Sequence, residues 1–166
     1  MRLWLAFFLL PLPALAETTP QDVLTARYRA QTDACTQSAE RPSRIEPCYD
    51  LLTAACMAGE ADGQTTQGMA LCIQAEHRYW DEALNREYQA ARAELARSDA
   101  ADRPEYAHRA DNLRDAQRAW IAFRDAQCAL DYSLPGGGSM RLLNGASCQA
   151  RRTFDRLRDL IALRDR

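Results

Sequence analysis

Residues 113–128 read LRDAQRAWIAFRDAQC, and this stretch decides how the rest of the chain folds. Every third or fourth residue, Leu113, Gln117, Trp120, Arg124 and Cys128, falls on one face of a helix with about 3.6 residues per turn. Gln117 and Arg124 are polar, although the face that they share is expected to be buried. A buried guanidinium is costly unless it finds an acceptor, so this face must meet a surface that carries carboxylates or carbonyls.

The sequence around this stretch predicts three long helices, at residues 66–97, 104–132 and 146–164. A short polar turn joins the first two, so these two helices should be antiparallel neighbours. The third should return beside the second. We therefore predict an all-α fold: an antiparallel long-helix hairpin plus a returning C-terminal helix, with a disulfide-stapled N-terminal helical extension at residues 17–55.

Counting back from the turn of this hairpin places Asp81 opposite Trp120 and Arg124. Asp81 is therefore the first candidate to neutralise Arg124. In one interpretation the polar residues of the two helices form a buried network that fixes their register, with Asn85 and Tyr88 as further members. In the other, Gln117, Trp120 and Arg124 form a ligand site. The full inner face expected for the first long helix is Cys72, His77, Asp81, Leu84, Tyr88, Ala91 and Leu95.

The first 16 residues have the pattern of a cleavable signal peptide. Arg2 supplies the positive charge, residues 3–10 are apolar, and Ala14-Leu15-Ala16 is a small-x-small cleavage site. The apolar run is too short to span a bilayer, which takes about 20 helical residues. No cysteine follows the cleavage site directly, so we expect no lipid anchor. The mature protein should begin near Glu17 in the periplasm, with no membrane anchor after the signal is removed.

All six cysteines lie in the expected mature chain, and an even number in an exported protein favours disulfides. Metal binding is a weaker interpretation, because there is no Cys-x-x-Cys pair and the two histidines are separate from the cysteines. We therefore predict no metal and no free thiol. The favoured connectivity pairs neighbours in the sequence, Cys35–Cys48, Cys56–Cys72 and Cys128–Cys148. The main alternative joins Cys72 to Cys128 and Cys56 to Cys148.

Charge and residue pattern exclude two other classes of protein. All 21 basic residues are arginine and 23 residues are acidic, so there is no clustered positive field for nucleic acid. His77 and Asp81 lie one helical turn apart, but no serine or second histidine completes a triad with them. The acidic residues are scattered and form no paired-carboxylate cleft. The sequence therefore indicates neither an enzyme nor a cofactor, and it does not indicate an oligomeric state.

Several motifs, taken in order, resemble those of one family of exported bacterial proteins. They are Met69 to Cys72, Asp81-x-x-Leu84-Asn85-x-x-Tyr88, Leu113-x-x-x-Gln117-x-x-Trp120-x-x-x-Arg124-Asp125-x-x-Cys128, Gly137-Gly138-Ser139, and Cys148 followed by Arg156. The chain resembles the LprI-like lysozyme inhibitor N-terminal domain over about residues 56–160. The resemblance implies a domain at residues 56–166, structural roles for the motif residues of the two long helices, and a lysozyme-type muramidase as partner. Cys35 and Cys48 lie upstream of this domain, in the extension.

The glycine-rich connection at residues 135–144 is the place where inhibition could occur. A lysozyme cleft carries two catalytic carboxylates, so an inserted loop with a hydroxyl or a guanidinium could occupy it. Ser139 and Arg141 are the candidate partner-binding residues, and a Cys128–Cys148 disulfide would hold the loop at both ends. The alternative is a turn whose glycines permit positive φ. The sequence predicts an exported binding protein that occludes a muramidase cleft; a non-enzymatic cell-envelope interaction or structural module is the alternative.

Overall fold

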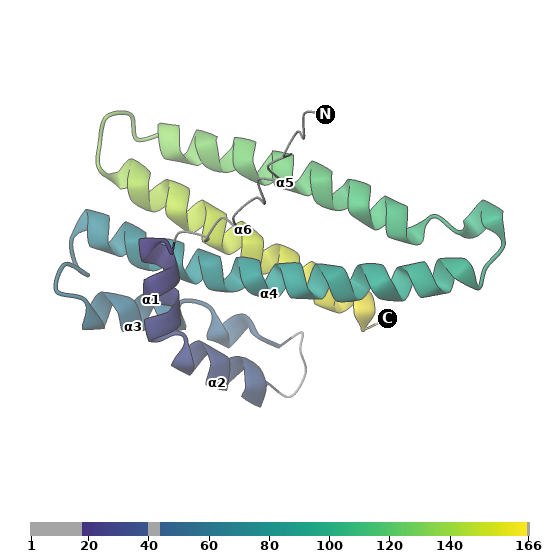
Figure 1. Ribbon diagram of the computed structural model, residues 1–166. Coiled ribbons are helices and arrows are strands. Elements are labelled where there is room, and N and C mark those ends of the chain that lie inside the picture. Colours follow the sequence, from purple (N-terminus) through teal and green to yellow (C-terminus); the bar gives the residue numbers. More distant parts are fainter. Residues whose placement is uncertain (1–17, 40–43, 166) are drawn as a thin grey trace, which may run out of the picture.

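The computed structural model describes residues 18–39 and 44–165, and every regular element in those ranges is helical (Figure 1). This confirms the all-α fold with its long hairpin and returning C-terminal helix. The expected signal peptide lies outside the described residues. The elements are α1 (Pro20–Tyr28), α2 (Ala30–Ser38), the 3-10 turn η1 (Glu46–Cys48), α3 (Leu51–Gly59), α4 (Thr66–Ala100), the 3-10 turn η2 (Pro104–Tyr106), α5 (Arg109–Ser133) and α6 (Met140–Arg164).

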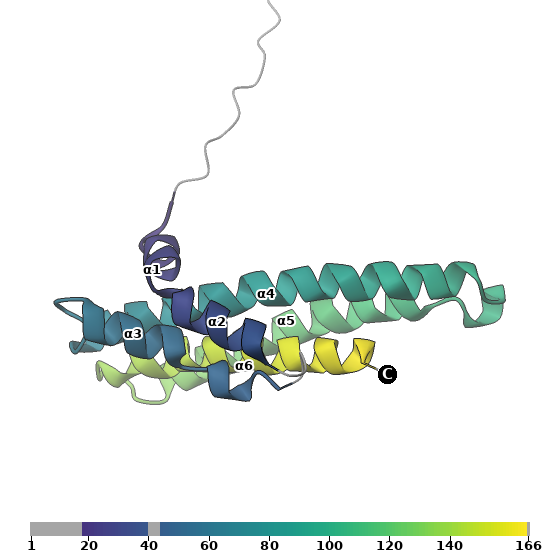
Figure 2. The ribbon, with the colours of Figure 1, turned by 90° about the horizontal axis from the view of Figure 1, so that it is seen from below.

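The three long helices form a bundle in which α6 packs against both members of the α4–α5 hairpin. Its contact with α4 is more extensive than its contact with α5. The two ribbon views show α6 running from the end of α5 across to the far side of α4 (Figures 1 and 2). The three short helices gather over the N-terminal half of α4. The returning helix, rather than the hairpin partner, is therefore the main surface against which α4 is buried.

Two of the long helices begin at other residues than the sequence predicted. Helix α5 begins at Arg109 instead of residue 104, because the Asp99 carboxylate accepts hydrogen bonds from the backbone N–H groups of Arg109 and Ala110, at 3.1 and 2.9 Å. Pro104 starts the separate turn η2. Helix α6 begins at Met140 instead of residue 146. Much of the connection expected at residues 135–144 is therefore the first turn of α6.

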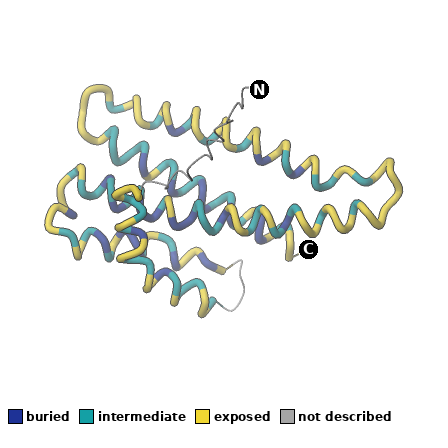
Figure 3. The backbone as a smooth tube through the Cα atoms, in the orientation of Figure 1, coloured by how far each residue is buried: buried dark blue, intermediate teal, exposed yellow. Residues whose placement is uncertain are grey.

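The centre of the core is an aromatic pair between α4 and α6. The rings of Trp80 and Phe154 meet edge to face with centroids 4.7 Å apart, and both side chains are fully buried. Leu84, Leu157 and Leu160 complete this layer. Figure 3 shows the buried positions concentrated where α4 and α6 face each other. The buried face of α4 contains Glu76, Tyr79 and Trp80, whereas the expected His77, Asp81, Tyr88 and Leu95 are only half-buried.

Glu76 is a fully buried carboxylate that holds α3 against α4. One oxygen accepts hydrogen bonds from the backbone N–H of Asp50 at 2.6 Å and from the Trp80 indole at 2.9 Å. The other accepts from the backbone N–H of Thr53 at 2.8 Å. Asp50 precedes α3 and its own side chain makes no capping bond. The Glu76 side chain thus caps the N-terminus of α3, in place of the side chain of the N-cap residue Asp50.

Three disulfides staple the short helices and the α5–α6 end. They are Cys35–Cys48, Cys56–Cys72 and Cys128–Cys148, which confirms the neighbour pairing, and the described residues contain no free cysteine. The alternative with a Cys72–Cys128 bridge is wrong. Thr25 also holds α1 against α4, because its hydroxyl donates a hydrogen bond to the backbone carbonyl of Ala75 at 2.8 Å.

No helix of the described residues is long and apolar enough to cross a lipid bilayer. Across the same part of the chain, no group of three or more His, Cys, Asp or Glu side chains is placed to hold a metal ion.

Candidate functional site

The polar stripe of α5 faces α6, and not the hairpin partner α4 that the sequence suggested. Gln117 is only 5% exposed, and its side-chain oxygen accepts a hydrogen bond from Arg156 Nε at 3.0 Å. Burial lowers the pKa of Arg156, and Asp159 partly offsets this effect. The Trp120 ring lies between two guanidiniums, 5.0 Å from that of Arg124 and 6.0 Å from that of Arg156. These contacts join α5 to α6.

Arg124 finds its acidic partner in its sequence neighbour. Its guanidinium lies 2.9 Å from Asp125 and 3.9 Å from Asp81, and the Arg124 side chain is 14% exposed. Asp81 also accepts a hydrogen bond from the Asn85 side chain at 3.0 Å. Asp81, the first candidate to neutralise Arg124, does pair with it, but at a longer distance than Asp125, which the sequence had not suggested. Arg124 also donates to the Thr153 hydroxyl of α6 at 3.5 Å.

The other motif residues of α4 differ in how far they are buried. Leu84 belongs to the core, Asn85 is exposed, and Tyr88 is half-buried against the core. Sequence reasoning missed Glu76 and Thr153, which are both fully buried and both hydrogen-bonded to other helices. The available signal for Glu76 was Trp80 one turn later, since an indole N–H needs an acceptor when it is buried.

His77 lines two pockets, a larger one between α1 and α4 and a smaller one between α4, α5 and α6. Its Nε2 is buried without a hydrogen-bond partner, and burial lowers its pKa below the ordinary value of 6.5. The pockets have volumes of about 510 and 320 Å³. Neither is lined by a serine or by a free cysteine of the described residues, and the Thr19 hydroxyl in the larger pocket donates a hydrogen bond to Asp22, at 2.8 Å. The geometry here therefore provides no nucleophile for the histidine to activate.

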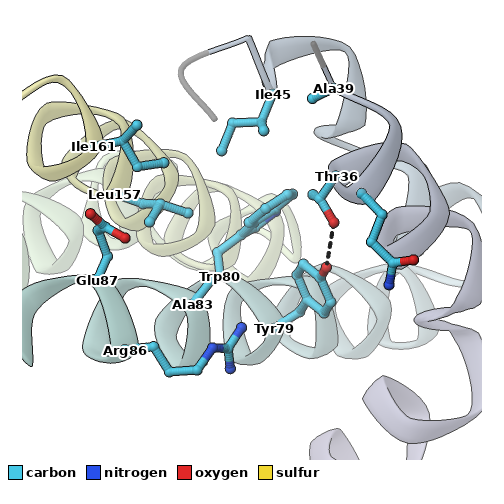
Figure 4. Close-up of a pocket in the computed structure, with 11 residues that line it drawn as sticks. Thr36, Ala39, Ile45, Tyr79, Trp80, Ala83, Arg86, Glu87, Leu157 and Ile161 are labelled. Atoms are coloured by element: carbon cyan, nitrogen blue, oxygen red, sulfur yellow. Dashed lines mark hydrogen bonds between the residues drawn. The ribbon is translucent and has the colours of Figure 1, made fainter. Parts of the chain in front are cut away.

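A further pocket of about 410 Å³ opens between α2, α4 and α6 (Figure 4). Trp80, Leu157 and Ile161 supply apolar wall. Several of its polar groups are already engaged with other protein groups: the Tyr79 hydroxyl donates to Asp33 at 2.9 Å, and Glu87 pairs with Arg164 at 2.7 Å. This pocket therefore offers few free polar groups to orient a ligand.

The connection between α5 and α6 is an exposed, disulfide-closed loop at one end of the bundle (Figure 1). Gly136 has φ of +62°, a conformation that favours glycine. A side chain added at Gly136 or Gly137 would meet no atom within 4 Å. The two glycines are therefore not required by packing, and they leave the backbone open to approach.

Ser139 and Arg141 flank the start of α6. Ser139 is exposed, and Arg141 is half-buried in the first turn of the helix. The Arg141 guanidinium lies 5.8 Å from the centroid of the Tyr132 ring, which holds it beside the loop. Within the described part of the chain, no carboxylate lies within 4.0 Å of this guanidinium. Arg141 is therefore a charged group that is positioned without being neutralised.

Exposed apolar side chains surround this end of the molecule. Leu134 is 70% exposed, and Leu130, Tyr132 and Met140 are exposed as well. Sequence reasoning did not select them as site residues. The available signal was that Leu130 and Leu134 lie four residues apart on a face of α5 that does not contain the buried Gln117 and Cys128.

Comparison with known proteins agrees with this arrangement of motifs. The family model described as lysozyme inhibitor LprI matches residues 56–160, which is more than half of the chain. An uncharacterized protein of Rhizobium meliloti is 37% identical over 97 residues, covering 54% of this chain and 67% of that protein. No solved structure gives a significant match. With its motifs, its disulfides and a match of this length, the chain belongs to the lysozyme inhibitor LprI family.

Proposed function

We propose that this protein inhibits a lysozyme-type muramidase by occluding its cleft with the α5–α6 end, without turnover. The observation that carries the proposal is the Arg141 guanidinium, which rests on Tyr132 beside an open glycine loop and has no acidic partner in the described residues. Ser139 is the neighbouring hydroxyl. Family membership supports the same class of function.

The position of Arg141 is unfavourable within the isolated protein. A positive charge in the first turn of a helix opposes the helix dipole, and no nearby carboxylate compensates here. A muramidase cleft offers the missing partner, because it carries two carboxylates about the scissile bond. A guanidinium forms strong charge-assisted bonds to a carboxylate. The Cys128–Cys148 disulfide and the Tyr132 contact restrict the loop end beforehand, which lowers the entropy cost of binding.

Export of the protein is part of the proposal. Three disulfides suit an oxidising compartment. We infer that residues 1–16 are removed near Ala16 and that the mature chain acts in the periplasm, where muramidases reach the cell wall. The domain division at residue 56, with residues 17–55 as an extension, belongs to the same proposal.

The test is the clearing of a cell-wall suspension by lysozyme in the presence of the purified mature protein. We expect the parent to slow the clearing. Arg141→Ala should weaken inhibition by about 2–5 kcal/mol, mainly through faster dissociation, because a charge inserted into a cleft acts on the off-rate. Ser139→Ala should cost less. The exposed Arg118→Ala on α5 is the matched control and should inhibit as the parent does.

Two results would contradict this proposal. If Arg141→Ala folds and inhibits like the parent, the contact lies on another surface. If the parent inhibits no lysozyme, the alternative of a cell-envelope interaction module takes its place.

A further inference from the structure

The pocket between α2, α4 and α6 opens onto the apolar core (Figure 4). Its volume of about 410 Å³ lies within the range of about 300–1,000 Å³ that is usual for small-molecule sites. Ile45, Leu157 and Ile161 supply aliphatic wall, and all three belong to the core cluster. Protein interiors are close-packed and keep few voids larger than a water molecule. An opening of this size beside the core therefore has room for an apolar ligand.

Two alanines leave the space that forms this pocket. Ala83 lies on α4, one helical turn after Tyr79 and one turn before Glu87, and all three line the pocket. Ala39 lines it from the end of α2. Both alanines are half-buried and pack against the core. A longer side chain at either position would therefore fill the pocket without removing any core residue.

Arg86 brings a positive charge to the edge of the pocket (Figure 4). Within the described part of the chain, this exposed arginine makes no ion pair and no hydrogen bond. The acidic residues next to it on α4 are engaged elsewhere, because Glu82 pairs with Arg29 at 3.7 Å and Glu87 pairs with Arg164 at 2.7 Å. The pocket thus combines an apolar wall with one cation that has no counter-charge.

We propose that this pocket binds a medium-chain alkyl carboxylate, with octanoate as the reference ligand. The carboxylate accepts charge-assisted hydrogen bonds from the Arg86 guanidinium, whose planar fork matches it. The alkyl chain leaves water and lies along the aliphatic wall of Leu157 and Ile161. A neutral ligand would leave the charge of Arg86 without a partner, and a small inorganic anion would leave the wall uncovered. The two features together therefore select an anion with an apolar chain.

Isothermal titration calorimetry of the mature protein with sodium octanoate measures this binding directly. We expect saturable binding at one site. From butanoate to octanoate, each added methylene should raise the affinity by up to about fourfold, because more apolar surface leaves water. The alcohol 1-octanol carries the same chain without a charge and should bind about tenfold more weakly than octanoate, since it lacks the charge-assisted bond.

Two substitutions separate the charge of Arg86 from the net charge of the protein. Arg86→Gln should lower the affinity for octanoate about tenfold, to the level of 1-octanol, and should leave the affinity for 1-octanol unchanged. Arg118→Gln removes the same charge at an exposed position of α5 and should bind octanoate as the parent does. Equal affinities of Arg86→Gln and the parent for octanoate would overturn the proposal.

Ala83→Leu fills the pocket and should abolish binding of both octanoate and 1-octanol, with folding checked by a circular dichroism melt. Where Ala83→Leu fails to fold, Ala39→Leu fills the pocket from α2 and gives the same readout. A folded filling variant that binds octanoate as the parent does would overturn the proposal. So would a parent that shows no saturable binding, or one that binds 1-octanol as tightly as octanoate. No muramidase enters these measurements, so their outcome is independent of the proposed inhibition.

Discussion

The buried carboxylate of Glu76 joins three parts of the protein through one residue. It accepts hydrogen bonds from two backbone N–H groups at the start of α3 and from the Trp80 indole. Burial raises the pKa of the adjacent Asp50, and the negative charge of Glu76 raises it further. Glu76 therefore couples α3 to the core through hydrogen bonds that are shielded from water.

Glu76→Gln should destabilise the protein by about 1–3 kcal/mol, because the amide nitrogen replaces one acceptor and leaves a buried donor unpaired. Urea unfolding followed by tryptophan fluorescence measures the change. Glu105→Gln, at an exposed position of η2, is the control and should change the free energy of unfolding little. Equal stability of the two variants would show that Glu76 is dispensable for the α3 cap.

Arg124 and Asp81 should contribute unequally to stability. Arg124→Ala removes the bonds to Asp125 and Thr153 and should cost about 1–3 kcal/mol. Asp81→Ala removes the 3.9 Å contact with Arg124 and an exposed hydrogen bond from Asn85, and it should cost less than about 1 kcal/mol. A double-mutant cycle from thermal melts separates the two residues. A coupling energy above about 1 kcal/mol would instead make Asp81 the principal partner.

His77 should make stability depend on pH below neutrality. Its folded-state pKa is lowered by burial, so below about pH 6.5 the unfolded chain binds a proton that the folded protein binds less readily. The free energy of unfolding therefore falls as the pH decreases from 6.5. Nearby charges act in both directions, with Asp81 and Asp125 raising the pKa and Arg124 and Arg78 lowering it.

His77→Gln should flatten the melting temperature between pH 7 and pH 5 relative to the parent. His108→Gln, at the exposed residue before α5, should follow the parent curve. Identical curves for His77→Gln and the parent would assign the pH dependence to other groups.

At the scale of helices, the sequence was sufficient for the number and approximate positions of the long elements, because each carries a clear helical pattern. It was insufficient for two of the boundaries. The cap of α5 comes from Asp99 at the end of the preceding helix, a long-range contact that no local pattern contains. The residues after the glycines looked like loop because glycine is a poor helix former, yet α6 begins at Met140.

The sequence also did not reveal which helix packs against the polar stripe of α5. Gln117, Trp120 and Arg124 were correctly expected on one inward face, but counting residues back from the short turn assigned this face to the hairpin neighbour. The returning helix supplies Arg156 and Thr153 instead. The disulfide pairing was predictable because neighbouring cysteines flank turns, whereas the exposure of Leu130 and Leu134 on α5 emerged only once burial was known.

Removal of the Cys128–Cys148 disulfide tests the α5–α6 end as an element. The bridge joins residues 20 positions apart, and replacing both cysteines by serine should cost about 3 kcal/mol through added freedom of the unfolded chain. Inhibition should weaken as well, since the loop end is no longer held. Replacing Cys35 and Cys48 is the control: it should lower stability by a similar amount but leave inhibition intact. Thermal melts and the cell-wall assay give the two readouts.

At the scale of the whole molecule, the hydrophobic core and the exposed glycine loop occupy different parts of the bundle. The core lies between α4 and α6, the short helices cover the first half of α4, and the glycine loop projects from one end (Figures 1 and 2). The proposed inhibitory loop and the exposed apolar side chains of Leu130 and Leu134 lie at the end of α5. Substitutions at these positions therefore leave the aromatic core untouched.

The order of the disulfides along the chain also determines how easily they form. Every cysteine is bonded to its neighbour in the sequence, at separations of 13, 16 and 20 residues, so no covalent ring encloses or crosses another. A chain that enters an oxidising compartment N-terminus first exposes its thiols in the order in which they pair. The second, fourth and sixth cysteines in the chain (Cys48, Cys72 and Cys148) then each emerge when the only unpaired thiol is their native partner.

An oxidant alone should therefore be enough to mature this protein. Secretion into a bacterial periplasm that lacks disulfide isomerase should yield as much native protein as secretion into the parent strain, measured by non-reducing peptide mapping. Mispaired species that accumulate without the isomerase would contradict this expectation. Translocation of the chain from its N-terminus is then enough to produce the native pairing, because each cysteine pairs with its neighbour in the sequence.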